Sequence, residues 1–511
     1  MSITATRSSW RALGVLSLAM LVIGLDTMVL MVALPSLSTE LGATTNQLQW
    51  ITTVYPLVLG AFMIPLGALG DRWGRSRLLA LSLLGFGAAS ALCAVSTGPG
   101  MLIAGRALLG LCAAAATPLS MAVLPGLFPE PGERQRAMGI WMASSALGMP
   151  LGPIVGGVLL QHFWWGSVFL INVPIAMIGA IAVWRMIPDS RGVATGARFD
   201  VPGSLLSIVG FGALVYAFTD AGRSGWTSAA FLAWLGVAAA FLVAFVVREL
   251  RVAYPLVRLD LLRRPGFRAG TILAAMSMMV LAGATFQFSQ EFSAAFGADA
   301  LGVGLRMLPI IGALIVATRI GEPAVRALGR RTVAAGACLL LLAACVVQAT
   351  AASGGYGVYA VMSVLLGLGL GGLIPLAMSL ATLDLHDSDA GSGSALLQSL
   401  RQIASALGVA VLGSVVSTAY LQRLGTVDMP RAVRAVAEDG VVAGTAVARA
   451  AAPDAVSGIV AAYEHGLAAS GLVASAVCVV LVALCLLIPA QSAHEQADED
   501  EQERDGVPRT A

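Results

Sequence analysis

Long apolar runs, each about 20 residues in length and separated by short polar connections, recur along the whole chain. A run of this length forms a helix that crosses the hydrocarbon core of a bilayer. The pattern predicts an all-α polytopic membrane protein with fourteen membrane-spanning helices, at residues 11–34, 46–69, 78–97, 101–125, 137–160, 167–187, 202–220, 228–247, 268–290, 302–320, 332–350, 357–381, 393–420 and 466–489.

The polar connections indicate how these helices are oriented. Most arginines fall in connections on one side of the predicted membrane, among them the loop that holds Arg72 and Arg75 and the stretch 248–268. Because arginine is enriched on the cytoplasmic side, both termini are expected in the cytoplasm. An even number of spans agrees with this orientation.

Internal repetition predicts the domain organisation: a six-helix half at 1–190, two inserted linker helices at 191–265, and a second six-helix half at 266–490. The polar loop at 321–331 reads as a decayed copy of the loop at 67–77, with Val325 near the place of Asp71. Within the second half, the connection at 421–464 is expected outside the cell. It should hold two short amphipathic helices that break near Gly440 and Pro453.

The composition supports a membrane protein and argues against several other classes. Hydrophobic residues make up 58% of the 511 residues and charged residues 11%, whereas charged residues are about a quarter of a soluble domain. The net charge of +2, without a basic face carrying aromatic residues, argues against a nucleic-acid partner. The six cysteines lie inside apolar runs, so we expect small buried hydrophobic side chains and no metal site. The acidic tail at 491–511 is too polar to pack and is expected to be disordered.

Asp26 is an acid deep inside the first predicted helix. A charged carboxylate costs several kcal/mol at such a position, so these residues are rare and commonly bind protons or cations. A hydrogen bond that packs two helices together is the alternative. Arg106 lies in the fourth predicted helix, roughly 9 Å from its outer end, and Asp26 lies roughly 12 Å from the outer end of the first. The two opposite charges are therefore expected at similar depth, where protonation of the acid would change the surroundings of the arginine.

The stretch GALGDRWGRSR forms a tight cationic turn between the second and third predicted helices. Its chemistry-bearing residues are Gly67, Asp71, Arg72, Gly74 and Arg75, and Asp71 is expected to bond across to a neighbouring helix as a latch. The spacing of glycine, aspartate and arginine resembles the signature between helices 2 and 3 of the major facilitator superfamily of transporters. The resemblance implies a conformational hinge here.

Three further motifs resemble those of this superfamily. The run L-D-T-x-x-x-x-V-A-L-P around Asp26 resembles the helix 1 signature of its fourteen-helix drug:proton antiporters. The spacing of Leu102, Arg106 and Gly110 is similar to the superfamily's helix 4 motif, and the G-x-x-x-G-P-x-x-G-G string in the fifth predicted helix resembles the antiporter motif of its exporters. The resemblance implies proton coupling through Asp26 and Arg106, and export as the direction of transport. The glycine string, which close helix packing alone also explains, comprises Gly148, Gly152, Pro153, Gly156 and Gly157.

Polar, aromatic and methionine side chains in several helices are candidates for a substrate pocket. Core packing is the more frequent meaning of methionine and aromatic residues. For the three polar residues at the end of the ninth predicted helix, a polar helix end in interfacial water is as plausible as binding. The candidates are Asp26, Met28, Tyr55, Phe286, Gln287, Gln290, Glu291 and Gln398.

The resemblance and the residues together favour proton-coupled efflux of amphipathic drugs or antibiotics by alternating access. The expected partners are a lipophilic small molecule, protons and membrane lipids, in a monomer of a bacterial cytoplasmic membrane. A carrier of an endogenous metabolite is the nearest alternative, and the glycine string argues against it. An intramembrane enzyme or receptor is disfavoured because catalytic, nucleotide and metal motifs are lacking, so we expect no cofactor, with the proton gradient as the energy source.

Overall fold

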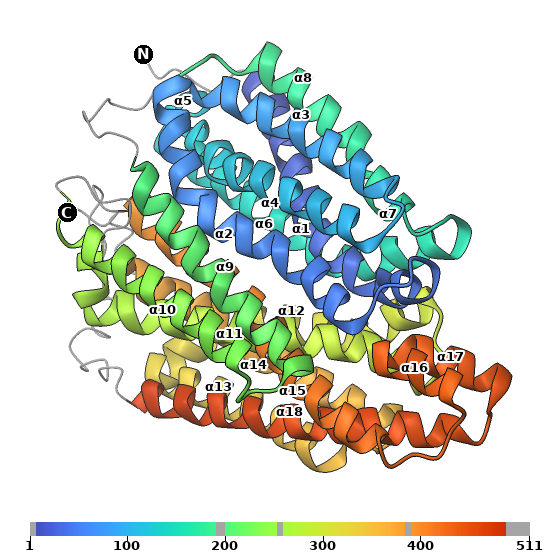
Figure 1. Cartoon of the computed structure of the whole chain (residues 1–511). Coiled ribbons are helices and arrows are strands. Elements are labelled where there is room, and N and C mark those ends of the chain that lie inside the picture. The colour runs from blue at the N-terminus through green and yellow to red at the C-terminus, as the bar shows by residue number, and fades with distance from the viewer. Residues whose placement is uncertain (1–6, 191–199, 253–258, 384–389, 487–511) are drawn as a thin grey trace.

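The computed structural model describes residues 7–190, 200–252, 259–383 and 390–486, and all the regular structure within these ranges is helical (Figure 1). The first part of the chain forms α1 (Arg7–Glu40), α2 (Thr45–Trp73), α3 (Arg75–Ala94), α4 (Pro99–Ala122), the short α5 (Leu124–Leu127), α6 (Pro131–His162), the short α7 (Ser167–Leu170) and α8 (Asn172–Met186).

The chain continues with a pair of helices and then a second group. The pair is α9 (Val201–Ser224) and α10 (Ala229–Glu249), and the short 3₁₀ helix η1 (Leu259–Arg263) leads out of it. The second group is α11 (Pro265–Ala294), α12 (Ala300–Leu328), α13 (Arg330–Ala351), α14 (Tyr356–Leu383), α15 (Ala390–Leu424), the short α16 (Arg431–Asp439) and α17 (Val441–Ala451), and α18 (Ala455–Leu486).

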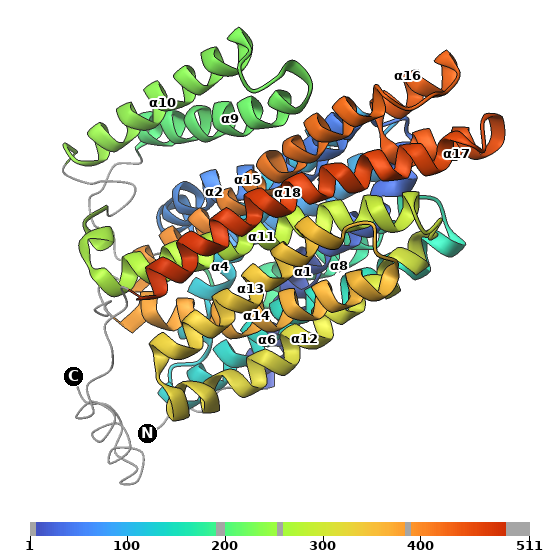
Figure 2. The same cartoon turned by 90° about the horizontal axis from the view of Figure 1, so that it is seen from below.

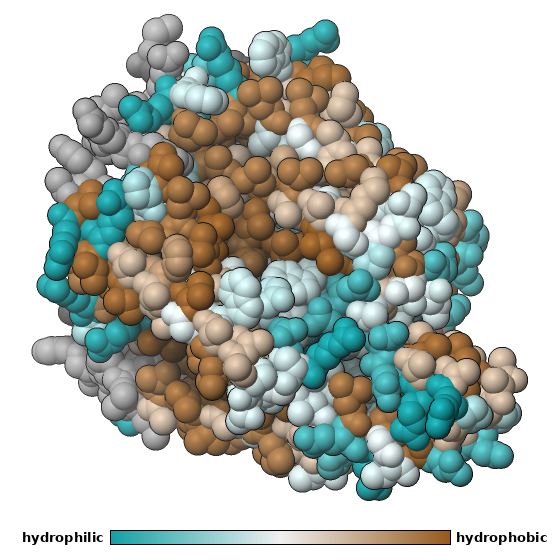
Figure 3. All heavy atoms as spheres, in the orientation of Figure 1, coloured by the Kyte–Doolittle hydropathy of each residue, from teal (hydrophilic) through white to brown (hydrophobic). Residues whose placement is uncertain are grey.

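Thirteen helices in the described part of the chain are long and apolar enough to cross a membrane. The fifth predicted span, 137–160, corresponds to α6, which covers it but is less apolar along most of its length. The thirteen helices and α6 together match the fourteen predicted spans, so the all-α polytopic prediction is confirmed. Apolar residues cover most of the face seen in Figure 3, as lipid contact requires, and hydrophilic residues gather toward its margins.

Alternating crossings bring the start of α1 and the end of α18 to one end of the bundle. We call this the proximal end, and we call the opposite end, where α16 and α17 lie, the distal end (Figure 1). The prediction of two short helices that break at Gly440 is confirmed by α16 and α17. The extent of the connection was overestimated, because α15 continues to Leu424 and α18 already begins at Ala455.

Buried apolar side chains form two large clusters. The first joins the helices from α1 to α8 and also includes Ala282 and Phe286 of α11 and Val409 of α15. The second joins α11 to α18 and also includes Phe245 of α10. The predicted domain boundaries stay predictions, as does disorder of the tail, which lies outside the described residues. The thiols of Cys93, Cys338, Cys345, Cys478 and Cys485 are buried and free, as expected, whereas that of Cys112 is half-buried.

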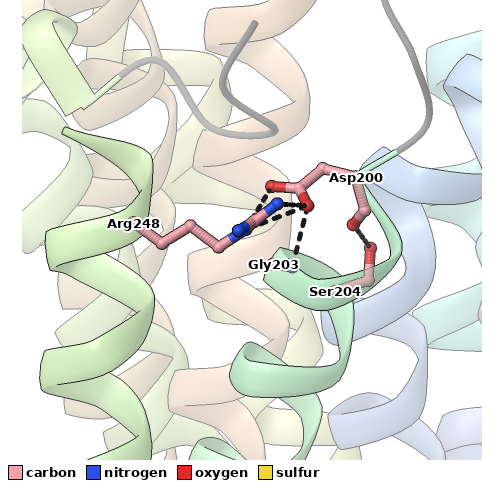
Figure 4. Close-up of polar contacts among 4 residues, drawn as sticks. All are labelled: Asp200, Gly203, Ser204 and Arg248. Atoms are coloured by element: carbon pink, nitrogen blue, oxygen red, sulfur yellow. Dashed lines mark hydrogen bonds and ion pairs between the residues drawn. The ribbon is translucent and has the colours of Figure 1, made fainter. Parts of the chain in front are cut away.

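The helices α9 and α10 lie side by side at the edge of the bundle, with α9 against α2 and α15 (Figures 1 and 2). An ion pair joins the start of α9 to the end of α10: Arg248 Nη2 lies 2.7 Å from Asp200 Oδ1 (Figure 4). The Gly203 amide also donates to Asp200, at 3.0 Å, so this carboxylate caps α9 as well. Burial raises the pKa of Asp200, but the hydrogen bonds of Arg248 and Gly203 and the charge of Arg248 outweigh it and hold the pKa below its usual value.

The two clusters meet closely toward the distal end. There α1 contacts α11, where the Ser289 hydroxyl donates to the Met31 carbonyl. Close by, α6 contacts α12 so tightly that a Cβ on Gly157 would lie 2.9 Å from Leu301 Cα. The bundle is therefore closed at this end between these helices.

The internal repeat is visible in the backbone at two glycines. Gly74 between α2 and α3, with φ of 119°, corresponds to Gly329 between α12 and α13, with φ of 81°. Both conformations suit glycine, because other residues rarely adopt positive φ. When these glycines are aligned, the residue at the place of Asp71 is Arg326, one position after the predicted Val325. The second copy has therefore replaced the acid by a base.

Candidate functional site

The centre of the first half holds a buried ion pair between Asp26 of α1 and Arg106 of α4. Arg106 Nη1 contacts Asp26 Oδ2, and the two side chains are each 1% exposed. The sequence predicted opposite charges at matched depth, and the contact confirms it. The role of the pair in proton coupling stays a prediction.

Three further groups complete the surroundings of the pair. Asn172 Nδ2 donates to Asp26 Oδ1 at 3.1 Å, and Arg106 Nε donates to the Ile51 carbonyl at 3.2 Å. The guanidinium carbon of Arg106 lies 4.4 Å from the centroid of the Tyr55 ring. Four helices, α1, α2, α4 and α8, therefore converge on one carboxylate and one guanidinium.

Asn172 was not predicted as a functional residue, although it is fully buried. It is the first residue of α8, and the break between α7 and α8 brings it against α1. The available signal was a polar residue in the otherwise apolar stretch 168–176. Its contact with α1 could not be read from that signal.

The arrangement suits reversible protonation. An isolated buried charge is costly, and here each charge offsets the other, while Asn172 and the Ile51 carbonyl add one hydrogen bond each to the carboxylate and the guanidinium. A proton on Asp26 would remove the negative partner and leave Arg106 with only the Ile51 carbonyl and the face of Tyr55. Protonation would therefore weaken the attachment of α4 to α1, and the two helices could then move relative to each other.

The glycine string of α6 has two faces. Gly148, Gly152 and Gly156 lie against α1, and a Cβ on Gly152 would collide with the Cβ of Met28. Pro153 and Gly157 lie against α12 instead: the Pro153 carbonyl approaches Gly304, and Gly157 approaches the start of α12. The predicted close packing is confirmed. The second face shows in addition that the string joins the first cluster to the second.

The predicted hinge lies at the proximal end, where Asp71 pairs with Arg75 at 2.7 Å across the break at Gly74. Arg75 Nη1 also donates to the Ala122 carbonyl at 3.0 Å, so the pair ties the turn to the end of α4. This is the latch expected for Asp71, with Arg75 making the contact to α4. Arg72 is exposed.

The contact near the start of the motif differs from the prediction in detail. A Cβ on Gly67 would make only ordinary contact with Pro118, at 3.7 Å, whereas a Cβ on Gly70 would overlap with the side chain of Leu119. Gly70 is therefore the residue that allows α2 to approach α4.

Asp189, just after α8, is a further part of the hinge that the sequence did not reveal. Its carboxylate accepts from Ser76 Oγ at 3.1 Å and pairs with Arg77 Nε at 3.0 Å. It thus lies at the N-terminus of α3, where negative charge is favoured. A Cβ on Gly74 would displace this carboxylate, so a larger residue there would disturb the contacts of Asp189 as well as strain φ.

The pocket candidates do not gather at one site. Met28, Tyr55 and Phe286 lie in or beside the first cluster, and Tyr55 is part of the ion-pair surroundings. Gln398 accepts from Arg401 on α15.

The three polar residues of α11 are not at a wet helix end. Gln287, Gln290 and Glu291 are 1%, 3% and 0% exposed, so that interpretation was wrong. Gln287 binds inside the second cluster, where it donates to Ser470 and accepts from Gln348.

The model of the Major Facilitator Superfamily matches residues 16–409 of the chain. The puromycin resistance protein pur8 of Streptomyces alboniger is 32% identical over 429 residues, which are 82% of this chain and 84% of that protein. The multidrug efflux pump LfrA of Mycolicibacterium smegmatis is 32% identical over 436 residues, 84% of each chain. The tetracenomycin C resistance and export protein of Streptomyces glaucescens is 29% identical over 504 residues, 96% of this chain and 94% of its own.

Among solved structures, a bacterial homologue of the human lysosomal transporter Spinster, in an inward-facing and occupied conformation, is similar with a TM-score of 0.67. The alignment covers 94% of this chain and 97% of that chain at 15% identity, and it therefore shows the fold alone.

Proposed function

Because the chain belongs to the Major Facilitator Superfamily, we propose that it exports amphipathic drugs or antibiotics in exchange for protons, by alternating access of its two halves. The observation that carries the proposal is the buried Asp26–Arg106 pair with Asn172. It is a site that one proton can neutralise, and it lies where four helices meet.

In this mechanism the proton and the conformation are coupled through α4. With Asp26 ionised, Arg106 holds α4 to α1 and to the Ile51 carbonyl of α2. A proton on Asp26 frees the guanidinium and lowers the cost of moving these helices relative to one another. The α6 string then carries such a movement toward α12, because its two faces contact α1 and α12.

Export as the direction is supported by the relatives, which are described as resistance, efflux and export proteins. The proposed location is a bacterial cytoplasmic membrane, with the proximal end and both termini in the cytoplasm. The substrate class is lipophilic small molecules, and the transporter acts as a monomer without a cofactor. A carrier of an endogenous metabolite is the second candidate, but no contact in the described residues favours it.

The test uses Asp26→Asn in proteoliposomes with an imposed pH gradient. The amide oxygen can still accept from Arg106, and the amide NH2 group can donate to the side-chain oxygen of Asn172, which makes no hydrogen bond in the wild type. Folding should therefore be preserved, but the amide cannot bind and release a proton. We expect pH-driven transport and substrate-induced proton movement to be lost while substrate binding remains. Glu322→Gln, which changes an exposed acid of α12, is the control and should behave as the wild type. Full pH-driven transport by Asp26→Asn would refute the coupling assignment.

A further inference from the structure

A second acid, Glu291, is buried near the distal end of α11, and the mechanism above does not use it. Its side chain is 0% exposed, and neither carboxylate oxygen makes a hydrogen bond within the described residues. Burying an ionised carboxylate without a partner costs several kcal/mol or more. An acid in this position is therefore expected to perform a function.

Two phenylalanines close to Glu291 in the sequence of α11 pack against α14. The rings of Phe288 and Phe292, on the same helix, each lie 5.7 Å from that of Tyr359 on α14. The hydroxyl hydrogen of Tyr359 is donated to the Ala352 carbonyl at 2.7 Å. Since a tyrosine hydroxyl has one hydrogen to donate, Tyr359 can accept a hydrogen bond from a protonated Glu291 but cannot also donate one to a carboxylate.

The helix α18 also packs beside this part of α11. The Tyr463 hydroxyl donates to the Gln287 carbonyl, one turn before Glu291, at 3.4 Å. A proton would neutralise the Glu291 carboxyl and remove the cost of burying its charge.

The helix α17 lies over the distal end of α11, and its arginine binds a backbone carbonyl and does not pair with Glu291. Arg449 Nη2 of α17 donates to the carbonyl of Ala294 at 2.6 Å, which caps the end of α11 and holds α17 over it. Arg306 of α12 lies over the ring of Tyr356. The titratable and charged groups on the helices packed around this end of α11 include Asp299, Arg306, Tyr356, Tyr359, Tyr420, Arg449, Tyr463, Glu464 and His465.

We propose that Glu291 forms a second proton-binding site, in the second half of the transporter, which holds one proton while the distal end is closed. In this conformation Arg449 holds α17 over the end of α11, and Glu291 is fully buried. When the distal end opens, water reaches Glu291 and the proton can leave. The site is separate from Asp26, because Asp26 is paired with Arg106 and Asn172.

The proposal is tested by infrared spectroscopy of the purified full-length protein. At about pH 8, exposed carboxyl groups are ionised, so a remaining carboxylic-acid C=O band reports a protonated buried acid. We expect this band in the wild type and its loss in Glu291→Gln. Glu322→Gln should leave it unchanged.

Absence of the band in the wild type, or its persistence in Glu291→Gln, would overturn the proposal. The test is independent of the role of Asp26, because no transport is measured. If Asp26→Asn still transports while the band behaves as expected, the proposed coupling through Asp26 fails and the second proton site stands. If Asp26→Asn loses transport but the band does not behave as expected, only the second proton site is refuted.

Discussion

Arginine, and not merely a positive charge, is required at position 106. Its guanidinium makes three contacts: an ion pair with Asp26, a hydrogen bond to the Ile51 carbonyl and a cation–π contact with the Tyr55 ring. In Arg106→Lys, a single ammonium group can keep the ion pair with Asp26. It cannot at the same time reach the carbonyl and cover the ring.

The expected cost follows from the contacts that are lost. A hydrogen bond from a charged donor contributes about 1.5 to 3 kcal/mol, and a desolvated cation–π contact about 2 kcal/mol. Because lysine recovers part of this, we expect a net loss of about 2 to 3 kcal/mol, which corresponds to a roughly 30- to 150-fold change in an equilibrium or rate.

The assay is the initial rate of pH-driven transport in proteoliposomes, at equal amounts of reconstituted protein. Arg106→Lys should lower the rate by roughly 30- to 150-fold. Arg185→Lys, at the exposed end of α8, is the matched control and should leave it unchanged. Transport by Arg106→Lys at the wild-type rate would show that only the charge matters and that the three-way geometry has no role.

Three other predictions concern packing, the hinge and pH. Gly152→Ala should destabilise the protein by about 1 to 3 kcal/mol in thermal unfolding, because its Cβ overlaps with α1, whereas Gly139→Ala on the same helix has open space and should not. Gly74→Ala should slow turnover more than it weakens substrate binding. It should also slow turnover more than Gly329→Ala does, because both strain φ but only the first adds a collision. A large loss of substrate affinity at normal turnover would contradict this prediction. The depressed pKa of Asp200 means that its carboxylate stabilises the fold above its unfolded pKa of about 3.9 and that this contribution is lost as pH falls through the folded pKa. Asp200→Asn should therefore lower the melting temperature at neutral pH and have a smaller effect at acid pH, and an effect that does not decrease as the pH falls would refute the assignment.

The sequence by itself determined the helices, the polar turns and the central ion pair. A run of apolar residues long enough to cross a membrane must be helical there, because the backbone can satisfy its hydrogen bonds only within the helix. The depth of a residue in the membrane follows from its position along its helix. The sequence therefore placed Asp26 and Arg106 at similar depth before their contact was known. The turn at Gly74 was readable for a similar local reason, since glycine and charge interrupt an apolar run.

Only the tertiary structure decided which groups meet from distant parts of the chain. Asn172 reaches Asp26, and Asp189 reaches the start of α3, because helices remote in sequence pack together. The sequence allowed Glu291 to lie at a polar helix end in interfacial water, because counting residues placed it near the end of its span. It is buried because α17, α14 and α18 close around that end, and no local pattern in α11 specifies these neighbours. Apolar residues and depth are local properties of a helix, whereas burial and pairing depend on which faces of the other helices come to lie against it.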